Sequence, residues 1–129
     1  MCLSARAQEP GDILKGAVVY PLNHFAEQAD DSTEFSFLKV LLKDKRIVLL
    51  GEQSHGDGAT FAAKVRLVKF LHSELGFDML SFESGLYANY KAAQELNHTE
   101  ARNSPMLESV FPIWSETAEF LPLIQYAHD

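Results

Sequence analysis

Residues 47–85 read IVLLGEQSHGDGATFAAKVRLVKFLHSELGFDMLSFESG. The spacing of the apolar residues changes twice along this stretch. Residues 46–50 form a short apolar run that Gly51 closes, a pattern typical of a strand buried on both faces of a parallel sheet. Between residues 59 and 75 the apolar side chains recur at helical spacing, and Gly76 is well placed to end that helix. Residues 77–82 indicate a second strand. The order predicts a β-α-β unit, so the expected fold class is α/β, a parallel-sheet core with flanking helices.

The segments on either side of this unit are expected to be helical, with one irregular region. Residues 30–33 offer N-cap candidates for a helix that ends near residue 44. A further helix is expected over about residues 86–96, and residues 97–112 are rich in turn formers. Ser115 then opens a last helix that carries apolar side chains at helical spacing. These expectations describe one α/β unit without internal repeats.

Composition and charge exclude several classes of partner. The 129 residues are 47% apolar and 22% charged, which is the composition of one globular domain with a real core. Eighteen acidic residues against eleven basic ones give a net charge of −7. The basic residues are scattered, so a nucleic-acid surface is not expected, and anionic membranes are disfavoured as well. No apolar run approaches the roughly 18 residues of a membrane span. We therefore expect a soluble protein, and the composition leaves its oligomeric state open.

The N-terminal residues bear on localisation without deciding it. Cys2 is the single cysteine, so neither an intrachain disulfide nor a cysteine-based zinc site is possible. Residues 1–12 have the composition of a flexible leader. The A-x-A pattern that ends at Ala7 also fits the cleavage end of an export signal, although a complete signal is missing. Cytoplasmic and exported locations both remain open.

Chemically active side chains follow both expected strands. Glu52, Ser54 and His55 come directly after the first strand, and Glu83 comes directly after the second. In parallel sheets ligands gather beyond the carboxyl ends of the strands, so these groups are expected to converge on one rim. Two carboxylates can orient an imidazole and help it to take a proton from water. Singly, each also has a structural explanation: Glu52 as a helix cap, His55 as a turn residue and Glu83 as a helix-terminal charge.

Residues 47–85 resemble the opening segment of the erythromycin esterase family. The shared features are a G-E-x-x-H-G turn, a long helix, the pair Gly-Phe and a strand that ends in Phe-Glu. The later stretch WSETAEFLPLIQYAHD, residues 114–129, resembles a later helix of that family. The resemblance runs from about Leu38 to Asp129, with its elements in the expected order.

The resemblance implies roles for particular residues. His55 matches the general base that activates water against a lactone carbonyl, and Glu52 and Glu83 match active-site carboxylates. Lys64 matches a basic position nine residues after that histidine, and we expect Lys64 and Ser54 to contact substrate. The implied substrate is a small-molecule ester or lactone, and neither a metal nor another cofactor is expected.

Two departures from the family pattern limit what can be carried over. Residues 59–61 read Ala-Thr-Phe where many relatives have an acidic-aromatic pair, which puts substrate contacts at that edge in doubt. Members of the family are also much longer, and their second catalytic histidine lies in the part that would follow Asp129. Residues 13–129 are therefore expected to be the N-terminal part of such a domain, with an incomplete sheet, and to be inactive as an isolated fragment.

Three alternatives to a histidine-base hydrolase stay open. Glu52, His55 and Glu83 could supply oxygen and nitrogen ligands to a metal ion in a metal-dependent hydrolase. A truncated relative could instead keep the scaffold as a non-catalytic interaction module. Finally, residues 52–56 resemble the G-x-S-x-G nucleophile elbow, which would make Ser54 a nucleophile, but glutamate replaces the first glycine.

Overall fold

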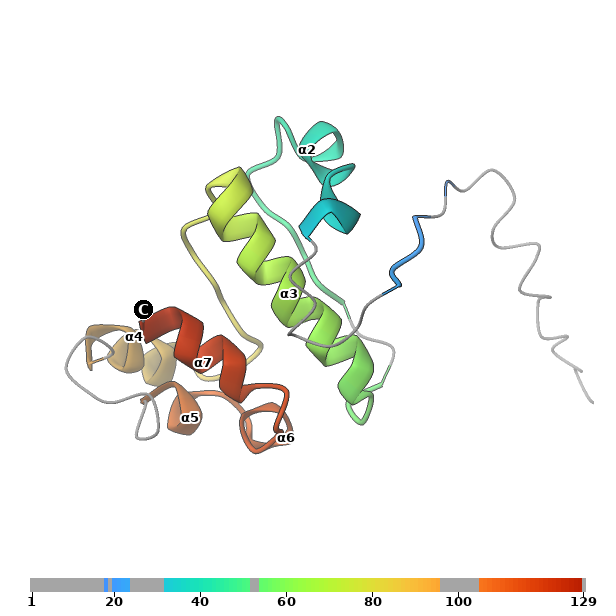
Figure 1. Ribbon diagram of the computed structural model, residues 1–129. Coiled ribbons are helices and arrows are strands. Elements are labelled where there is room, and N and C mark those ends of the chain that lie inside the picture. Colours follow the sequence, from blue (N-terminus) through green and yellow to red (C-terminus); the bar gives the residue numbers. More distant parts are fainter. Residues whose placement is uncertain (1–17, 19, 24–31, 52–53, 96–104, 129) are drawn as a thin grey trace, which may run out of the picture.

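The computed structural model describes residues 18, 20–23, 32–51, 54–95 and 105–128, and these residues form helices joined by extended and turn segments (Figure 1). The helices are η1 (Ser32–Phe35), α2 (Leu38–Leu41), α3 (Gly58–Leu75), α4 (Leu86–Glu95), α5 (Pro105–Ser109), α6 (Pro112–Ser115) and α7 (Leu121–His128). Within this part of the chain no residue is in a strand. No helix among the described residues is long and apolar enough to cross a membrane.

Helix α3 is the long central element, and both of its ends are capped. Asp57 is the N-cap, and its carboxylate accepts a hydrogen bond from the backbone N–H of Thr60 at 3.2 Å. Gly76 follows the last turn with φ of 71°, a left-handed conformation that favours glycine. Its N–H bonds back to the carbonyl of His72. The prediction of a helix over residues 59–75 that ends at Gly76 is confirmed.

One hydrophobic core joins α3 to the C-terminal helices. Among the described residues, Phe120, Ile124 and Val65 are the largest side chains that are fully buried. Figure 1 shows α7 beside α3, with α5 and α6 below α7 in this view. The buried members of the core are Val65, Val110, Trp114, Phe120, Leu123 and Ile124, and Phe61, Val68, Phe82, Met106 and Leu107 pack against them. Each fully buried large apolar side chain stabilises the fold by about 1.5–3 kcal/mol, so this cluster fixes α3 relative to residues 105–128.

The N-terminal elements attach to α3 through a second, smaller set of contacts. Phe35 of η1 packs on Phe70 with a ring separation of 5.6 Å. Beside these rings, Arg66 donates to the carboxylate of Glu34 at 3.1 Å, and both side chains are buried. The guanidinium of Arg66 also lies over the Phe35 ring, 5.2 Å from its centroid. A buried ion pair and an aromatic pair therefore hold η1 on α3.

The expected α/β fold is wrong for the described residues. Residues 46–50 and 77–82, the two expected strands, are neither helical nor paired. No backbone hydrogen bond joins residues 47–50 or 78–82 to other described residues. Their apolar side chains are largely exposed as well: Ile47 is 77% accessible, Leu49 89% and Met79 84%. A strand takes its hydrogen bonds from a neighbour, and here neither segment has one. The described chain is helical, without a parallel sheet.

Other boundaries also differ from expectation. Apolar spacing predicts one helix up to residue 44, but the structure has η1 and α2 separated by a turn. Ser115 ends α6 instead of opening a helix, because Pro112 starts α6 and the chain turns again before α7. Part of the expected irregular region forms α5, whereas residues 97–104 lie outside the described residues. The helix expected at residues 86–96 is confirmed as α4.

Candidate functional site

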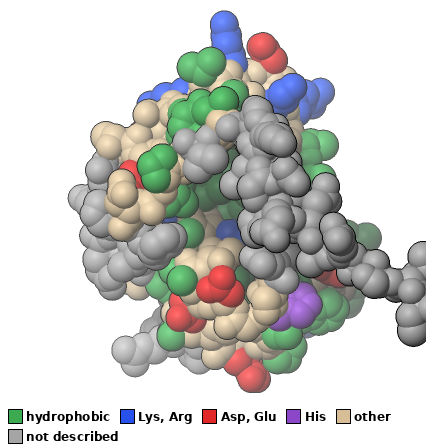
Figure 2. Space-filling view, turned by 90° about the vertical axis from the view of Figure 1, so that its right-hand side faces the viewer, with side chains coloured by type: hydrophobic (Ala, Val, Ile, Leu, Met, Phe, Trp, Pro, Cys, Tyr) green, Lys and Arg blue, Asp and Glu red, His purple; other side chains and the backbone are tan. Residues whose placement is uncertain are grey.

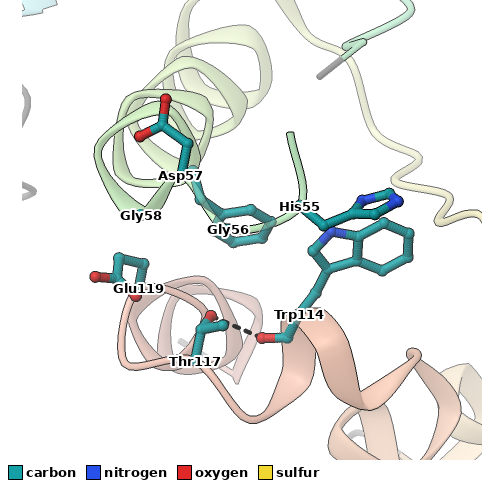
Figure 3. A pocket seen from close by; sticks show the side chains of 8 residues that line it. His55, Gly56, Asp57, Gly58, Trp114, Thr117 and Glu119 are labelled. Atoms are coloured by element: carbon teal, nitrogen blue, oxygen red, sulfur yellow. Dashed lines mark hydrogen bonds between the residues drawn. The ribbon is translucent and has the colours of Figure 1, made fainter. Parts of the chain in front are cut away.

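A surface cavity of about 220 Å³ lies where the N-terminus of α3 meets the loop between α6 and α7 (Figure 3). Its wall combines an imidazole, two larger aromatic rings, two carboxylic acid side chains and a hydroxyl group. The lining residues are His55, Gly56, Asp57, Gly58, Phe61, Trp114, Thr117 and Glu119. One wall thus comes from residues 55–61 and the other from residues 114–119, two segments far apart in the sequence.

A turn before α3 positions His55. Residues 55 and 56 form the turn, and the N–H of Gly56 lies 3.4 Å from the hydroxyl oxygen of Ser54, a long hydrogen bond. The imidazole then packs edge-to-face on Trp114, with ring centroids 5.7 Å apart. Trp114 is itself buried in the core. The indole therefore gives an otherwise exposed histidine a defined position at the mouth of the cavity.

The carboxylate of Asp57 is engaged by α3 itself. Besides the backbone bond to Thr60, it accepts a short hydrogen bond from the Thr60 hydroxyl. The hydrogen bonds from the Thr60 side chain and backbone, with a smaller one from the backbone of Ala59, hold the pKa of Asp57 below its ordinary value. Figure 3 shows this carboxylate turned toward the helix, away from Trp114. Asp57 contributes negative charge to the rim while its oxygens cap the helix.

Glu119 approaches the cavity from the opposite wall. A Cβ atom placed on Gly58 would lie 2.8 Å from Oε1 of Glu119, so the carboxylate rests directly on the first residue of α3. Its position is set by its neighbours in the loop: Phe120 is fully buried, and Thr117 donates to the carbonyl of Trp114 at 2.7 Å. The N-terminus of α3 favours negative charge at this point.

The residues expected to carry the chemistry are only partly brought together. His55 lies in the cavity, and Ser54 precedes it in the same turn with an exposed side chain. Glu83 is exposed and is not among the residues that line the cavity, and half-buried Lys64 on α3 is not among them either. Glu52 lies outside the described residues. The two-strand rim that would gather these groups is absent from the described chain.

Asp57, Thr117 and Glu119 are cavity residues that sequence reasoning did not identify. Asp57 is recognisable as an N-cap three residues before Thr60, but its approach to the second wall depends on the packing of α3 against the α6–α7 loop. Trp114 belongs both to the hydrophobic core and to the cavity wall. Among the described residues, no group of three or more His, Cys, Asp or Glu side chains has the arrangement of a metal site.

Comparisons with known proteins give two relatives. The protein named "Putative hydrolase YbfO" from Bacillus subtilis (strain 168) is 43% identical over 96 residues, which cover 72% of this chain and 20% of that protein. "Erythromycin esterase type II" from Escherichia coli is 35% identical over 68 residues, 53% of this chain and 16% of that protein. No family model and no solved structure matches the chain significantly. The chain spans about a fifth or less of the length of these two relatives. Their names support a resemblance to erythromycin-esterase-like hydrolases, and this chain is similar to one part of each.

Proposed function

We propose that the chain contributes a histidine-base site to a hydrolase that cleaves a small-molecule ester or lactone. The observation that carries the proposal is the position of His55, which lines a cavity and is held against Trp114. The similarity to a protein named as a hydrolase and to one named as an erythromycin esterase supports the reaction class.

The proposed reaction needs one base and one water molecule. The imidazole of His55 takes a proton from water while the water oxygen bonds to the carbonyl carbon, which gives a tetrahedral intermediate and an imidazolium. Collapse of the intermediate breaks the bond to the alcohol oxygen. The imidazolium returns its proton to that oxygen, so the products are a carboxylic acid and an alcohol. In a lactone both groups stay on one molecule.

Supporting roles are proposed for the other residues that the sequence singles out. Glu52 and Glu83 are proposed to orient His55 or the attacking water, and Ser54 and Lys64 to contact substrate. The exposed position of Glu83 means that its carboxylate is accessible to a ligand, whereas a core position would exclude one. The roles of Glu52, Glu83 and Lys64 predict loss of activity without loss of folding when the side chain is replaced, whereas loss of the Ser54 hydroxyl is expected to have a small effect.

The test is ester and lactone hydrolysis by the product of the complete reading frame that encodes this chain. His55→Ala is expected to abolish turnover of p-nitrophenyl acetate and of a simple lactone, because no other group takes the proton from water. Ser54→Ala is the matched control, since it changes the same turn and keeps the imidazole. We expect it to retain most of the activity.

Two results would contradict the proposal. A burst of acyl-enzyme that disappears in Ser54→Ala would make the serine a nucleophile. Unchanged turnover in a folded His55→Ala protein, judged by circular dichroism, would remove the histidine from the chemistry. Glu83→Gln separates catalysis from structure in the same assay: reduced activity at an unchanged melting temperature supports its proposed role.

A further inference from the structure

A general base has to be held in a fixed orientation, and the turn that carries His55 is at the surface. The side chain of His55 is exposed. Exposed side chains change rotamer within picoseconds to nanoseconds unless a neighbour holds them. A misplacement of about 1 Å at a catalytic group can cost about 10²-fold in rate. The neighbour that holds the imidazole therefore bears on catalysis.

Trp114 is a neighbour whose own position is fixed. Its indole is 9% exposed and belongs to the hydrophobic core. The N–H of Trp114 donates to the carbonyl of Phe111 at 3.0 Å. The Trp114 carbonyl accepts hydrogen bonds from the N–H and the hydroxyl of Thr117, at 3.0 and 2.7 Å. Packing of the side chain and hydrogen bonding of the backbone together give the rigid support that a functional group needs.

The contact between the two rings has a directional geometry. The ring centroids of His55 and Trp114 are 5.7 Å apart, and the ring planes meet at 74°. Aromatic pairs favour this edge-to-face arrangement because ring edges carry positive and ring faces negative partial charge. Figure 3 shows the imidazole next to the indole at the cavity. Such a contact restricts the side-chain torsions of the histidine, and with them the directions in which its two ring nitrogens point.

We propose that Trp114 is a positioning residue for the hydrolysis, and that its indole holds His55 so that a ring nitrogen reaches the attacking water. The inference rests on the proposed function, since it takes His55 to be the base. The indole takes no part in proton transfer and acts only through the imidazole. Its contact sets the plane of the imidazole ring, whereas a hydrogen-bonding carboxylate would set the tautomer. The role is therefore additional to those proposed for Glu52 and Glu83.

Kinetics of the product of the complete reading frame, with p-nitrophenyl acetate as substrate, separate positioning from substrate binding. Trp114→Leu keeps an apolar side chain and removes the aromatic face. We expect it to lower kcat by about 30-fold to 100-fold while KM changes by less than about three-fold. Trp114→Phe keeps a ring against His55 and should restore kcat to within about five-fold of the unmodified protein. Leu123→Ala is the packing control, because Leu123 is buried in the same core and does not line the cavity, and its kcat should change by less than about two-fold.

The orientation of the imidazole has a spectroscopic signature that does not depend on activity. The 129-residue chain, labelled with ¹³C at the Cε1 atom of its five histidines, is recorded by NMR in dilute samples at about pH 9, where histidine in water is neutral. His55→Gln identifies the signal of His55. The ring current of the indole should displace this signal from that of free histidine. Trp114→Leu should abolish the displacement, and Trp114→Phe should reduce it, because a benzene ring has a weaker ring current than an indole.

Three results would overturn the inference. The first is a His55 signal that coincides with that of free histidine in the unmodified chain. The second is a kcat of Trp114→Leu no lower than that of Leu123→Ala, and the third is a raised KM at unchanged kcat, which would assign Trp114 to substrate binding. If Trp114→Leu does not fold, the His55 signals of the unmodified chain and of Trp114→Phe decide the matter. Failure of the hydrolase proposal is distinguishable, because His55→Ala would then leave turnover unchanged while the displaced His55 signal persists.

Discussion

At the scale of single residues, the buried pair of Glu34 and Arg66 should contribute more to stability than an exposed ion pair does. Its side chains are 7% and 5% exposed, whereas those of the exposed pair Lys39 and Glu74 are 50% and 42%. Removing one partner of a buried pair leaves a charge in a low-dielectric environment, and an exposed charge keeps its water. Similar N–O distances, 3.1 and 2.7 Å, therefore correspond to different contributions to stability.

We expect Glu34→Ala to lower the free energy of unfolding by about 3–5 kcal/mol and Glu74→Ala by less than about 1 kcal/mol. Urea denaturation followed by circular dichroism measures both values. Equal losses in the two variants would mean that water reaches Arg66 as freely as it reaches Lys39.

The chemical role of a residue could be predicted from the sequence more readily than the residues that surround it in the folded structure. The sequence predicts His55 as a site residue, and His55 lines the cavity. Glu119 was missed because nothing near it in the sequence marks it. Its relevance comes from Gly58, about sixty positions earlier, whose missing side chain allows the carboxylate to approach.

At the scale of elements, α3 was predictable because a helix makes its hydrogen bonds within itself and carries its own end signals. Residues 46–50 and 77–82 were not predictable in this way. An apolar run indicates burial, but a strand also requires a neighbour, and local sequence does not supply one. The two segments instead remain extended and unpaired in the described chain.

The glycine that ends α3 should resist substitution. Because Gly76 has φ of 71°, Gly76→Ala is expected to lower the free energy of unfolding by about 1–2 kcal/mol. Nothing lies within 4 Å of a Cβ at Gly76, so the loss comes from backbone conformation and not from a clash. Gly51→Ala is the control, since Gly51 has equal space around it and is not among the positive-φ residues. A thermal melt in which Gly51→Ala loses as much stability as Gly76→Ala would contradict this explanation.

The other end of α3 should make stability depend on pH. The pKa of Asp57 is held below its ordinary value of 3.8 by the hydrogen bonds from Thr60. Because the pKa is lower in the folded state, the ionised cap contributes its full stabilisation of the fold above about pH 3.8. This stabilisation is lost as the pH falls through the pKa of the folded state. Asp57→Asn keeps a capping oxygen that does not titrate, so its melting temperature should fall less between pH 5 and pH 2 than that of the unmodified chain. Parallel pH profiles for the two proteins would show that the carboxylate does not act in this way.

At the scale of the whole molecule, the core is well formed on one side of α3 and much apolar surface remains elsewhere. Trp114, Phe120 and Ile124 are buried. Residues 47–50 nevertheless expose three large apolar side chains, and Met79 with Leu80 exposes two more. Figure 2 shows hydrophobic side chains reaching the surface in several places on the face drawn there. Single exposed apolar residues are ordinary, but consecutive ones mark surfaces that associate.

We therefore expect the 129-residue chain to self-associate in a concentration-dependent way, despite the mutual repulsion of a net charge of −7. Leu49→Lys should shift the weight-average mass toward the monomer, because it places a charge on the large apolar side chain that is most exposed among the described residues. Ser73→Lys adds the same charge at an exposed polar position of α3, so it serves as the control and should change association less. Size-exclusion chromatography with multi-angle light scattering across a range of concentrations measures both effects. A monomer at every concentration would show that these side chains are too dispersed to form an interface. Equal shifts of the mass in the two variants would show that charge controls association and that apolar contact does not.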